Sequence, residues 1–230
     1  MAENVSFASN GDSADGYLAL PPSGSGPGLI VVQEWWGVNP QIKAMADRFA
    51  GEGFVALCPD LYHGELATHD EMDKATHLMN TLPADRAARD MLGAVDYLLA
   101  RDEVTGETVG VIGFCMGGML TMILAGLGGD KIGAACPYYG APVFGNAPDW
   151  NNLSAPISGH YAGIDDFFGP DKVTPLYDDL RAMGKDVTMV VHEGAHHAFA
   201  NEENADGYDK DLAEQCLAES VAFLKKNLQA

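Results

Sequence analysis

The stretch Val109–Gly118, VGVIGFCMGG, decides the fold, because it joins a predicted buried strand to a predicted helix through a tight turn. Within it, the run Gly113-Phe114-Cys115-Met116-Gly117 has the glycine spacing of a nucleophile elbow, with cysteine where serine is usual. Side chains two residues before and after the nucleophile would collide in that turn, so glycine stands at both positions. The turn projects the Cys115 thiol out of the sheet and sets it at a helix N-terminus, whose dipole favours the thiolate. On its own, the spacing also fits a small apolar residue in a tight turn.

Apolar strands and amphipathic helices alternate along the rest of the chain. An N-terminal hairpin is predicted over 5–9 and 17–20, turning at Asp15-Gly16. Strands are then predicted over 29–35, 54–60, 109–115, 132–140, 156–163 and 186–193, and helices over 41–50, 70–79, 84–100, 116–127, 172–183 and 208–228. This alternation predicts the α/β class, a mainly parallel sheet with helices on both faces. We expect one domain over residues 1–230, with little or no cap.

Composition and charge exclude several classes of partner. The 230 residues carry a formal net charge of −20, which argues against nucleic acid or an anionic membrane as a partner. No apolar run approaches the ~18 residues of a membrane span, and the acidic N-terminus lacks the features of a signal peptide. We therefore expect a cytoplasmic protein, a monomer or weak homodimer, that acts on a small molecule. In that compartment the four widely spaced cysteines (Cys58, Cys115, Cys136 and Cys216) should be free thiols.

Polar side chains at the ends of the predicted strands are the candidates for a site, because ligands of such sheets bind beyond the carboxyl ends of the strands. They are Glu34, Cys115, Tyr138, Tyr139, Asp165 and His196 or His197. The chain order nucleophile, acid, histidine is the order of this fold class. Asp165 would orient an imidazole, and His196 or His197 would take the thiol proton. An oxyanion hole would then need two backbone N–H groups, which we assign to Trp35 and Met116.

The segment His192–His196, HEGAH, literally matches the H-E-x-x-H zinc motif. That motif needs one helical face to bring both histidines to the metal. Here residues 186–191 have the pattern of a strand, and Gly194 falls inside the motif. We therefore expect neither a metal nor another cofactor.

The quoted motifs together resemble those of the dienelactone hydrolase family, cysteine hydrolases of the α/β-hydrolase fold. The resemblance covers nearly the whole chain and is carried by QEWWGVNPQI, GFVALCPDLY, GFCMGG, YYG, HYAGIDDFF and GAHHAF. It implies that Cys115 is the nucleophile, that His197 is the base and that Asp165 is the acid. It also implies that Glu34 lies beside the cysteine and exchanges a hydrogen bond with it.

The sequence departs from the family at the residues that the resemblance implies for holding a substrate carboxylate. Of the two arginines expected, one is replaced by Asn201, and the other falls near Met72, where Lys74 is the nearest cation. Aromatic side chains suggest an apolar wall instead, and we assign substrate contacts to Trp36, Tyr139, Phe168, Phe199 and Asn201. The leading hypothesis is hydrolysis of a small neutral ester or lactone through a thioester acyl-enzyme. The alternatives are a carboxymethylenebutenolidase acting on carboxylate-bearing dienelactones, a redox-sensing thiol protein and a zinc hydrolase.

Overall fold

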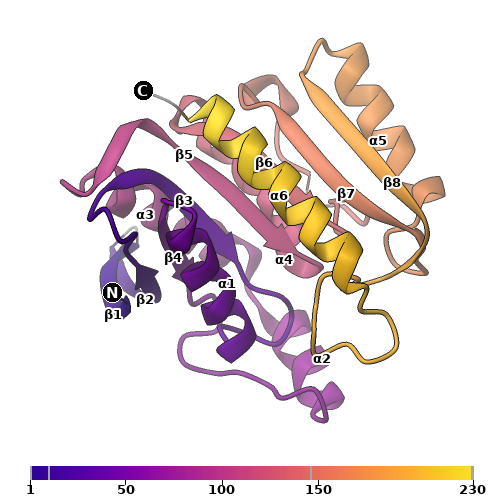
Figure 1. Ribbon diagram of the computed structural model, residues 1–230, viewed down its shortest axis with the longest axis horizontal. Helices are drawn as coiled ribbons and strands as arrows, with labels where there is room; N and C mark the ends of the chain where they lie inside the picture. Colours follow the sequence, from indigo (N-terminus) through magenta and orange to yellow (C-terminus); the bar gives the residue numbers. More distant parts are fainter. Residues whose placement is uncertain (1, 10, 146, 229–230) are drawn as a thin grey trace.

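The computed structural model describes residues 2–9, 11–145 and 147–228. Within these ranges eight strands form one sheet in the order β1-β2-β4-β3-β5-β6-β7-β8 (Figure 1). The strands β1 to β8 are Ala2–Ser9, Asp12–Ala19, Gly26–Val32, Val55–Pro59, Val104–Phe114, Ile132–Tyr138, Ile157–Ile164 and Val187–His196. β2 pairs antiparallel with β1 and β4, and every other neighbouring pair is parallel. The predicted mainly parallel sheet is confirmed.

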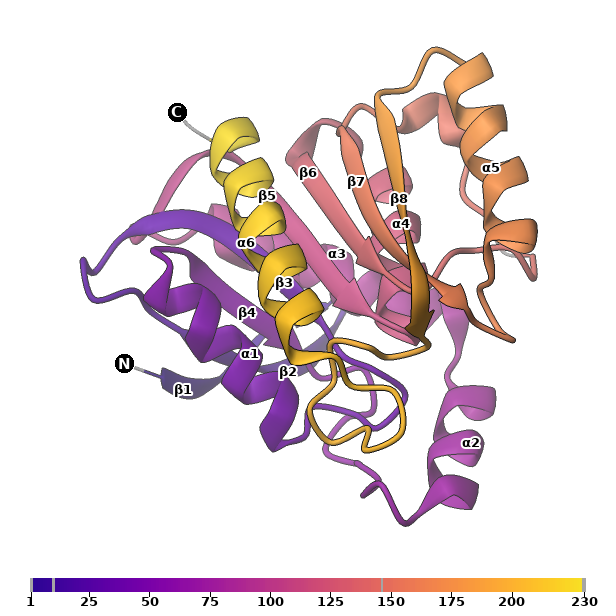
Figure 2. The same cartoon turned by 45° about the vertical axis from the view of Figure 1, so that its right-hand side comes forward.

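Helices cover both faces of this sheet. On one face lie α1 (Pro40–Gly51) and α6 (Lys210–Asn227), and on the other α3 (Ala84–Leu99), α4 (Met116–Gly128) and α5 (Pro170–Ala182). The helix α2 (Met72–Thr81) extends away from the sheet, as Figure 2 shows. Two 3₁₀ turns, η1 (Gly129–Lys131) and η2 (Trp150–Asn152), flank β6. None of the helices in the described ranges is long and apolar enough to cross a membrane.

The central strand β3 shows how the sequence specifies these layers. Successive side chains of a strand point to opposite faces. Leu29 and Val31 pack in the core beneath α1 and α6, while Ile30 and Val32 pack in the core beneath α3 and α4, and all four are fully buried. Full burial of one such side chain contributes roughly 1.5–3 kcal/mol to folding. A strand that is buried on both faces therefore appears in the sequence as an unbroken apolar run.

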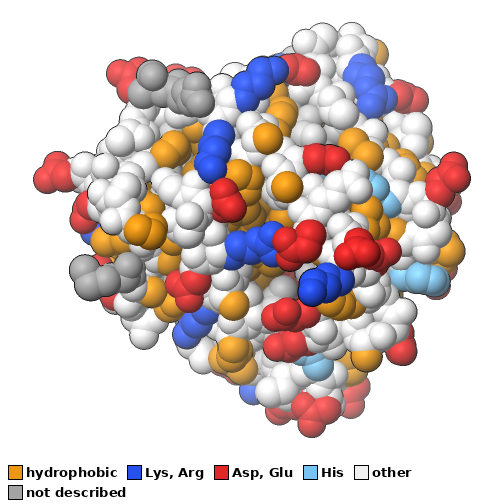
Figure 3. Space-filling model, in the orientation of Figure 1, with side chains coloured by type: hydrophobic (Ala, Val, Ile, Leu, Met, Phe, Trp, Pro, Cys, Tyr) orange, Lys and Arg blue, Asp and Glu red, His pale blue; other side chains and the backbone are white. Residues whose placement is uncertain are grey.

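Side-chain caps set where α1 and α6 begin. The Asn39 side chain accepts a hydrogen bond from the Ile42 N–H at 3.0 Å, and Pro40 opens α1. Asp209 does the same for the Leu212 N–H at 3.1 Å, so α6 begins at Lys210 rather than at residue 208. Basic and acidic side chains stand side by side over these two helices (Figure 3). These exposed pairs add little stability.

The sequence prediction of the N-terminal hairpin is wrong in its turn. β1 ends at Ser9 and β2 begins at Asp12, with Gly11 at φ +96° between them. Gly16 lies instead inside β2, opposite Val5 of β1. A Cβ at Gly16 would lie 2.8 Å from the carbonyl oxygen of Cys58 on β4. This glycine is therefore required by the close approach of a neighbouring strand and not by a turn. β3 also ends at Val32, three residues before the predicted end, which leaves residues 33–35 in a loop.

Candidate active site

The link between β5 and α4 forms a strained elbow at Cys115. β5 ends at Phe114, α4 begins at Met116, and Cys115 has φ 54° and ψ −118°. For a residue with a side chain such a backbone costs on the order of 1–3 kcal/mol. A Cβ at Gly113 would lie 2.4 Å from the carbonyl oxygen of Gly117, and one at Gly117 would lie 2.5 Å from those of residues 32 and 33. The steric reason predicted for both glycines is confirmed.

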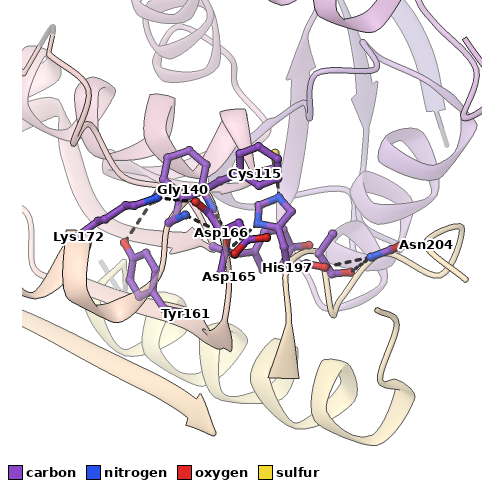
Figure 4. A network of polar contacts seen from close by, with 12 residues as sticks. Cys115, Gly140, Tyr161, Asp165, Asp166, Lys172, His197 and Asn204 are labelled. Atoms are coloured by element: carbon purple, nitrogen blue, oxygen red, sulfur yellow. Dashed lines mark hydrogen bonds and ion pairs between the residues drawn. The ribbon is translucent and has the colours of Figure 1, made fainter. Parts of the chain in front are cut away.

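Cys115, His197 and Asp165 form one hydrogen-bonded chain (Figure 4). His197 follows directly after β8; its Nε2 lies 3.2 Å from the Cys115 Sγ and its Nδ1 lies 2.7 Å from Asp165 Oδ2. Asp165 follows β7, and its Oδ1 accepts hydrogen bonds from the N–H groups of Phe167 and Phe168. His196 is exposed in the last position of β8. The geometry thus places His197, not His196, between the thiol and the carboxylate.

Charge in the site concentrates on His197. Burial lowers the pKa of its imidazole, but the hydrogen bonds to Asp165 and Cys115 outweigh burial and raise the pKa to about 10. Burial also acts to raise the pKa of Asp165, but the hydrogen bond and charge of His197 outweigh it, so the net shift is downward. The raised pKa favours the imidazolium form of His197. The ring faces the Asp165 carboxylate on one side and the Cys115 sulfur on the other.

The other cysteines are free but inaccessible. Cys58, Cys136 and Cys216 are buried, whereas Cys115 is partly exposed. Burial raises the pKa of Cys136 and of Cys216 to about 12 and also raises that of Cys58. Burial therefore disfavours a free thiolate at these three cysteines, so Cys115 is the cysteine placed to act as a nucleophile.

Glu34 lies next to the hydrogen-bonded chain of Cys115, His197 and Asp165, but its own hydrogen bonds are to other residues. Asn201 Nδ2 donates to Glu34 Oε2 at 2.7 Å, and the Tyr139 hydroxyl makes a longer contact of 3.5 Å with Oε1. The Asn201 amide is oriented from its other end, where Oδ1 accepts from the Glu203 N–H at 3.0 Å. Burial raises the pKa of Glu34 to about 7, against the opposing effects of the His197 charge and the Asn201 hydrogen bond. The protein partners of Glu34 thus differ from the cysteine partner that the family resemblance implies.

The two backbone N–H groups predicted to form the oxyanion hole have no acceptor among the described residues. They belong to Trp35, in the loop after β3, and to Met116, the first residue of α4. The carbonyl of Trp35 accepts a hydrogen bond from the Tyr62 hydroxyl at 3.1 Å, which fixes this loop against the elbow. Gly37, with φ +92°, then turns the chain toward α1. Both predicted oxyanion donors are therefore free to bind an oxygen.

The aromatic residues assigned to substrate divide into two groups. Phe168 and Tyr139 lie beside His197, with ring centroids 6.1 and 5.3 Å from the imidazole. Phe199 is fully buried and packs on Tyr139, and Trp36 packs between Trp35 and His69. Neither Phe199 nor Trp36 contacts the imidazole in the described structure.

Sequence reasoning missed several residues of this region. Phe144 is 66% exposed, and its ring packs on Phe168 at 5.6 Å. Asn204 Nδ2 donates to the His197 carbonyl at 3.0 Å, and Tyr62 braces the Trp35 loop. Lys172 Nζ donates to the Asp166 carbonyl at the rim of the site. Only Tyr62 falls in a quoted motif, GFVALCPDLY, and that motif gave it no role, whereas the other three residues fall in none.

The HEGAH segment lies within β8, which continues three residues beyond the predicted end at residue 193, and Gly194 has φ +79°. His192 and His196 therefore share no helical face. His192 instead lies close to His160 of β7 and Cys216 of α6. No sequence motif links these three residues.

A mainly parallel sheet with an elbow after β5 and a histidine directly after β8, the last strand, defines a hydrolase of the α/β-hydrolase fold. A model described as the dienelactone hydrolase family matches residues 14–228, and the chain belongs to that family. It is thus an enzyme that hydrolyses carboxylic esters or lactones.

Relatives support the same assignment. Over 234 aligned residues the chain is 39% identical to the protein Usf of Aquifex pyrophilus, covering 99% of this chain and 100% of that one. It is 34% identical to an Aquifex aeolicus protein provisionally named carboxymethylenebutenolidase, with both chains fully covered. The crystal structure of a Klebsiella pneumoniae protein, provisionally named a dienelactone hydrolase, superposes with a TM-score of 0.87 at 28% identity, covering 97% of this chain and 98% of that one.

Proposed function

We propose that the enzyme hydrolyses small, uncharged carboxylic esters or lactones through a thioester formed on Cys115. The observation that carries this proposal is the position of His197, which bridges the thiol and Asp165 with contacts of 3.2 and 2.7 Å. That bridge supplies both an activated nucleophile and a proton donor.

In the first half of the reaction the Cys115 thiolate attacks the ester carbonyl carbon. Negative charge develops on the carbonyl oxygen, and the free N–H groups of Trp35 and Met116 stabilise it. The tetrahedral intermediate then collapses, the carbon–oxygen bond to the alcohol breaks, and the His197 imidazolium protonates the departing oxygen. The acyl group remains on the sulfur as a thioester.

In the second half His197 is neutral and accepts a proton from water, which attacks the thioester. The acid leaves and the thiolate–imidazolium pair is restored. Asp165 holds the imidazole in one orientation throughout and stabilises its positive charge. Because a thiolate is a better leaving group than an alkoxide, the first half works best on activated or strained esters, such as enol esters and lactones.

Two observations favour an uncharged substrate. The Asn201 side chain, at the position where the family resemblance implies an arginine, is 1% exposed and bonded to Glu34, so it offers no cation to a substrate. The aromatic rings of Phe167 and Phe168 next to His197, with Phe144 packed on Phe168, favour an apolar group.

The test compares two acetate esters that differ by one charge, those of methyl 4-hydroxybenzoate and of 4-hydroxybenzoate. We expect kcat/KM to be higher for the uncharged ester by about tenfold or more, which is about 1.4 kcal/mol of transition-state binding. Cys115→Ala should abolish turnover of both esters, and Cys58→Ala, which removes a buried thiol, should retain it. A tenfold preference for the charged ester, or full activity without Cys115, would contradict the proposal.

A carboxylate-bearing dienelactone is the second candidate substrate, and Lys172 is the observation that favours it. Its ammonium group lies at the rim of the site beside the carbonyls of Asp166 and Phe167. The name of the Aquifex aeolicus relative points to the same substrate class. If Lys172 binds the carboxylate, Lys172→Met should raise KM for the charged ester alone. An equal effect on both esters would eliminate this role.

A further inference from the structure

A second thiol–imidazole cluster lies on the face of the sheet that α6 covers, apart from the Cys115–His197 pair. It consists of His160 on β7, His192 on β8 and Cys216 on α6, and we name it the α6 cluster. His160 and Cys216 are buried, with 1% and 0% of their surfaces exposed, and His192 is partly exposed. One ring nitrogen from each histidine and the sulfur lie within 4.8 Å of one another.

Hydrogen bonds alone cannot satisfy these three groups. His192 Nε2 lies 3.1 Å from His160 Nδ1 and 3.3 Å from Cys216 Sγ. In a neutral imidazole this nitrogen carries either one hydrogen or one in-plane lone pair, so it serves one partner well. Whether that partner is His160 or Cys216, the other is left with a poor contact. The buried His160 Nε2 has no partner among the described residues, so no hydrogen bond at this nitrogen holds the ring in its orientation.

A cation that accepts one lone pair from each group removes this conflict. Zinc bonds of the usual lengths at a tetrahedral angle would separate two nitrogens by roughly 3.3 Å, and nitrogen from sulfur by roughly 3.6 Å. The observed 3.1 and 3.3 Å lie within a few tenths of an ångström of those values. Small rotations of the two imidazoles would turn both lone pairs toward a shared point.

We propose that His160 Nδ1, His192 Nε2 and Cys216 Sγ bind a divalent cation of the zinc type. On binding, the thiol proton leaves to solvent and the sulfur coordinates as thiolate, while both imidazoles coordinate in their neutral form. Two nitrogens and a sulfur select zinc or a softer metal and disfavour magnesium and calcium.

Glu219 is the nearest acidic residue along α6 to Cys216 on the same helix face and is the candidate for a fourth ligand. Glu219 follows Cys216 by three residues, which places both on the same face of the helix. Its carboxylate is exposed and accepts a hydrogen bond from Gln215 Nε2 at 2.9 Å. Either Glu219 or a water completes the coordination. The net charge of −20 adds a general attraction for a cation.

Such a site has a structural role. It joins α6 to β7 and β8, whereas the proposed reaction uses Cys115 and His197. A ligand that binds only the native state stabilises it by mass action. The metal therefore changes stability and leaves the reaction unaffected.

The experiment uses the full chain carrying Cys115→Ala, which removes the other thiol–imidazole pair that could bind the same metal. Titration with Co²⁺ should show that the protein binds one equivalent of the metal, and the bound metal should give thiolate-to-cobalt absorption. The absorption should be lost when Cys216→Ser or His192→Ala is added and retained when Cys136→Ser is added. Cys136 is the matched control, because it is an equally buried thiol outside the cluster. Zn²⁺ at about a hundredfold above its Kd should raise Tm by about 5–10 °C only where Cys216 and His192 are intact.

Two outcomes would overturn the proposal. One is cobalt absorption that is absent, or unchanged by Cys216→Ser. The other is a Zn²⁺-induced rise in Tm that is equal in the Cys216→Ser and Cys136→Ser variants. Cooperative melting of each variant without metal shows that a loss of binding is not a loss of fold. Esterase activity of Cys216→Ser with Cys115 present tests the proposed function separately.

Discussion

At the scale of single residues, the hydrogen bond to Asp165 is the largest of the effects that raise the pKa of His197. Asp165→Asn keeps the size of the side chain and removes the charge that raises the pKa of His197. We expect kcat to fall by about two to four orders of magnitude with little change in KM, because orientation and charge act on the transition state. Steady-state kinetics on the uncharged ester measures this. Asp166→Asn, a change at the exposed neighbour, is the control and should retain activity; a loss below tenfold in Asp165→Asn would refute the role.

Glu34 should impose a pH dependence on stability. Burial raises its pKa from 4.5 to about 7, so between these values the folded state binds more protons than the unfolded state. Stability therefore falls as pH rises from 4.5 to 7 and is constant above that range. At about 1.4 kcal/mol per pKa unit, the loss is about 3 kcal/mol.

Glu34→Gln should remove this dependence. The free energy of unfolding of the variant, relative to the natural chain, should be higher at pH 8 than at pH 4.5 by up to that amount. Urea denaturation at the two pH values checks it, with the exposed Glu107→Gln as control. A Glu34→Gln difference that is the same at both pH values would contradict the raised pKa.

A residue of the site could be predicted only where the sequence around it carries a local signal. Cys115 and Asp165 follow strands and belong to motifs, so chain order alone pairs them. The alternation of side chains along a strand could not decide whether His196 or His197 is the histidine of the site. Gly194 has φ +79° and the pairing of β7 with β8 shifts near Ala162, so the period of two is broken just before them. The α6 cluster was unpredictable because its members lie 24 and 32 residues apart on three elements.

At the scale of elements, the elbow depends on the absence of side chains. A Cβ at Gly117 would lie 2.5 Å from the carbonyl oxygens of residues 32 and 33, at the end of β3 and just after it. These are backbone atoms, so they cannot move away without shifting the strand. Gly117→Ala should therefore lower the free energy of unfolding by about 2–4 kcal/mol and abolish activity. Gly51→Ala is the matched control.

Gly51 ends α1, and a Cβ there would meet nothing within 4 Å. Gly51→Ala should raise the free energy of unfolding by about 0.4–1 kcal/mol, because alanine restricts the unfolded chain. Thermal and urea unfolding of the two variants measure both effects. Equal stability of the two would show that the elbow tolerates a side chain.

The error at the N-terminal hairpin shows why elements were predicted better than their boundaries. Asp15-Gly16 is a favourable turn pair locally, but Gly16 pairs with Val5 and with Pro59 on either side of it. Contacts with β4 decide its conformation, and those contacts lie more than 40 residues away in the sequence. The helices, whose apolar spacing is a local signal, were predicted to within about two residues at most ends.

At the scale of the whole molecule, the alternation of strands and helices predicts the class of sheet, whereas the strand order requires tertiary contacts. Fully buried runs such as residues 29–32 fit any interior position of a parallel sheet. Only the pairing of β3 with β4 and β5 places β3 at the centre. Periodicity along the sequence does not give this order.

The net charge of −20 makes a prediction that belongs to the whole molecule. A carboxylate-bearing ester approaches an acidic protein against repulsion, and salt screens that repulsion over a Debye length that falls from ~30 Å at about 0.01 M to ~3 Å at about 1 M. Its kcat/KM should therefore rise several-fold over this range, while that of the uncharged ester stays nearly constant. The ratio of the kcat/KM values of the two esters cancels any general effect of salt on the enzyme. A kcat/KM for the charged ester that falls with salt would show that a cation, with Lys172 the candidate, holds the carboxylate.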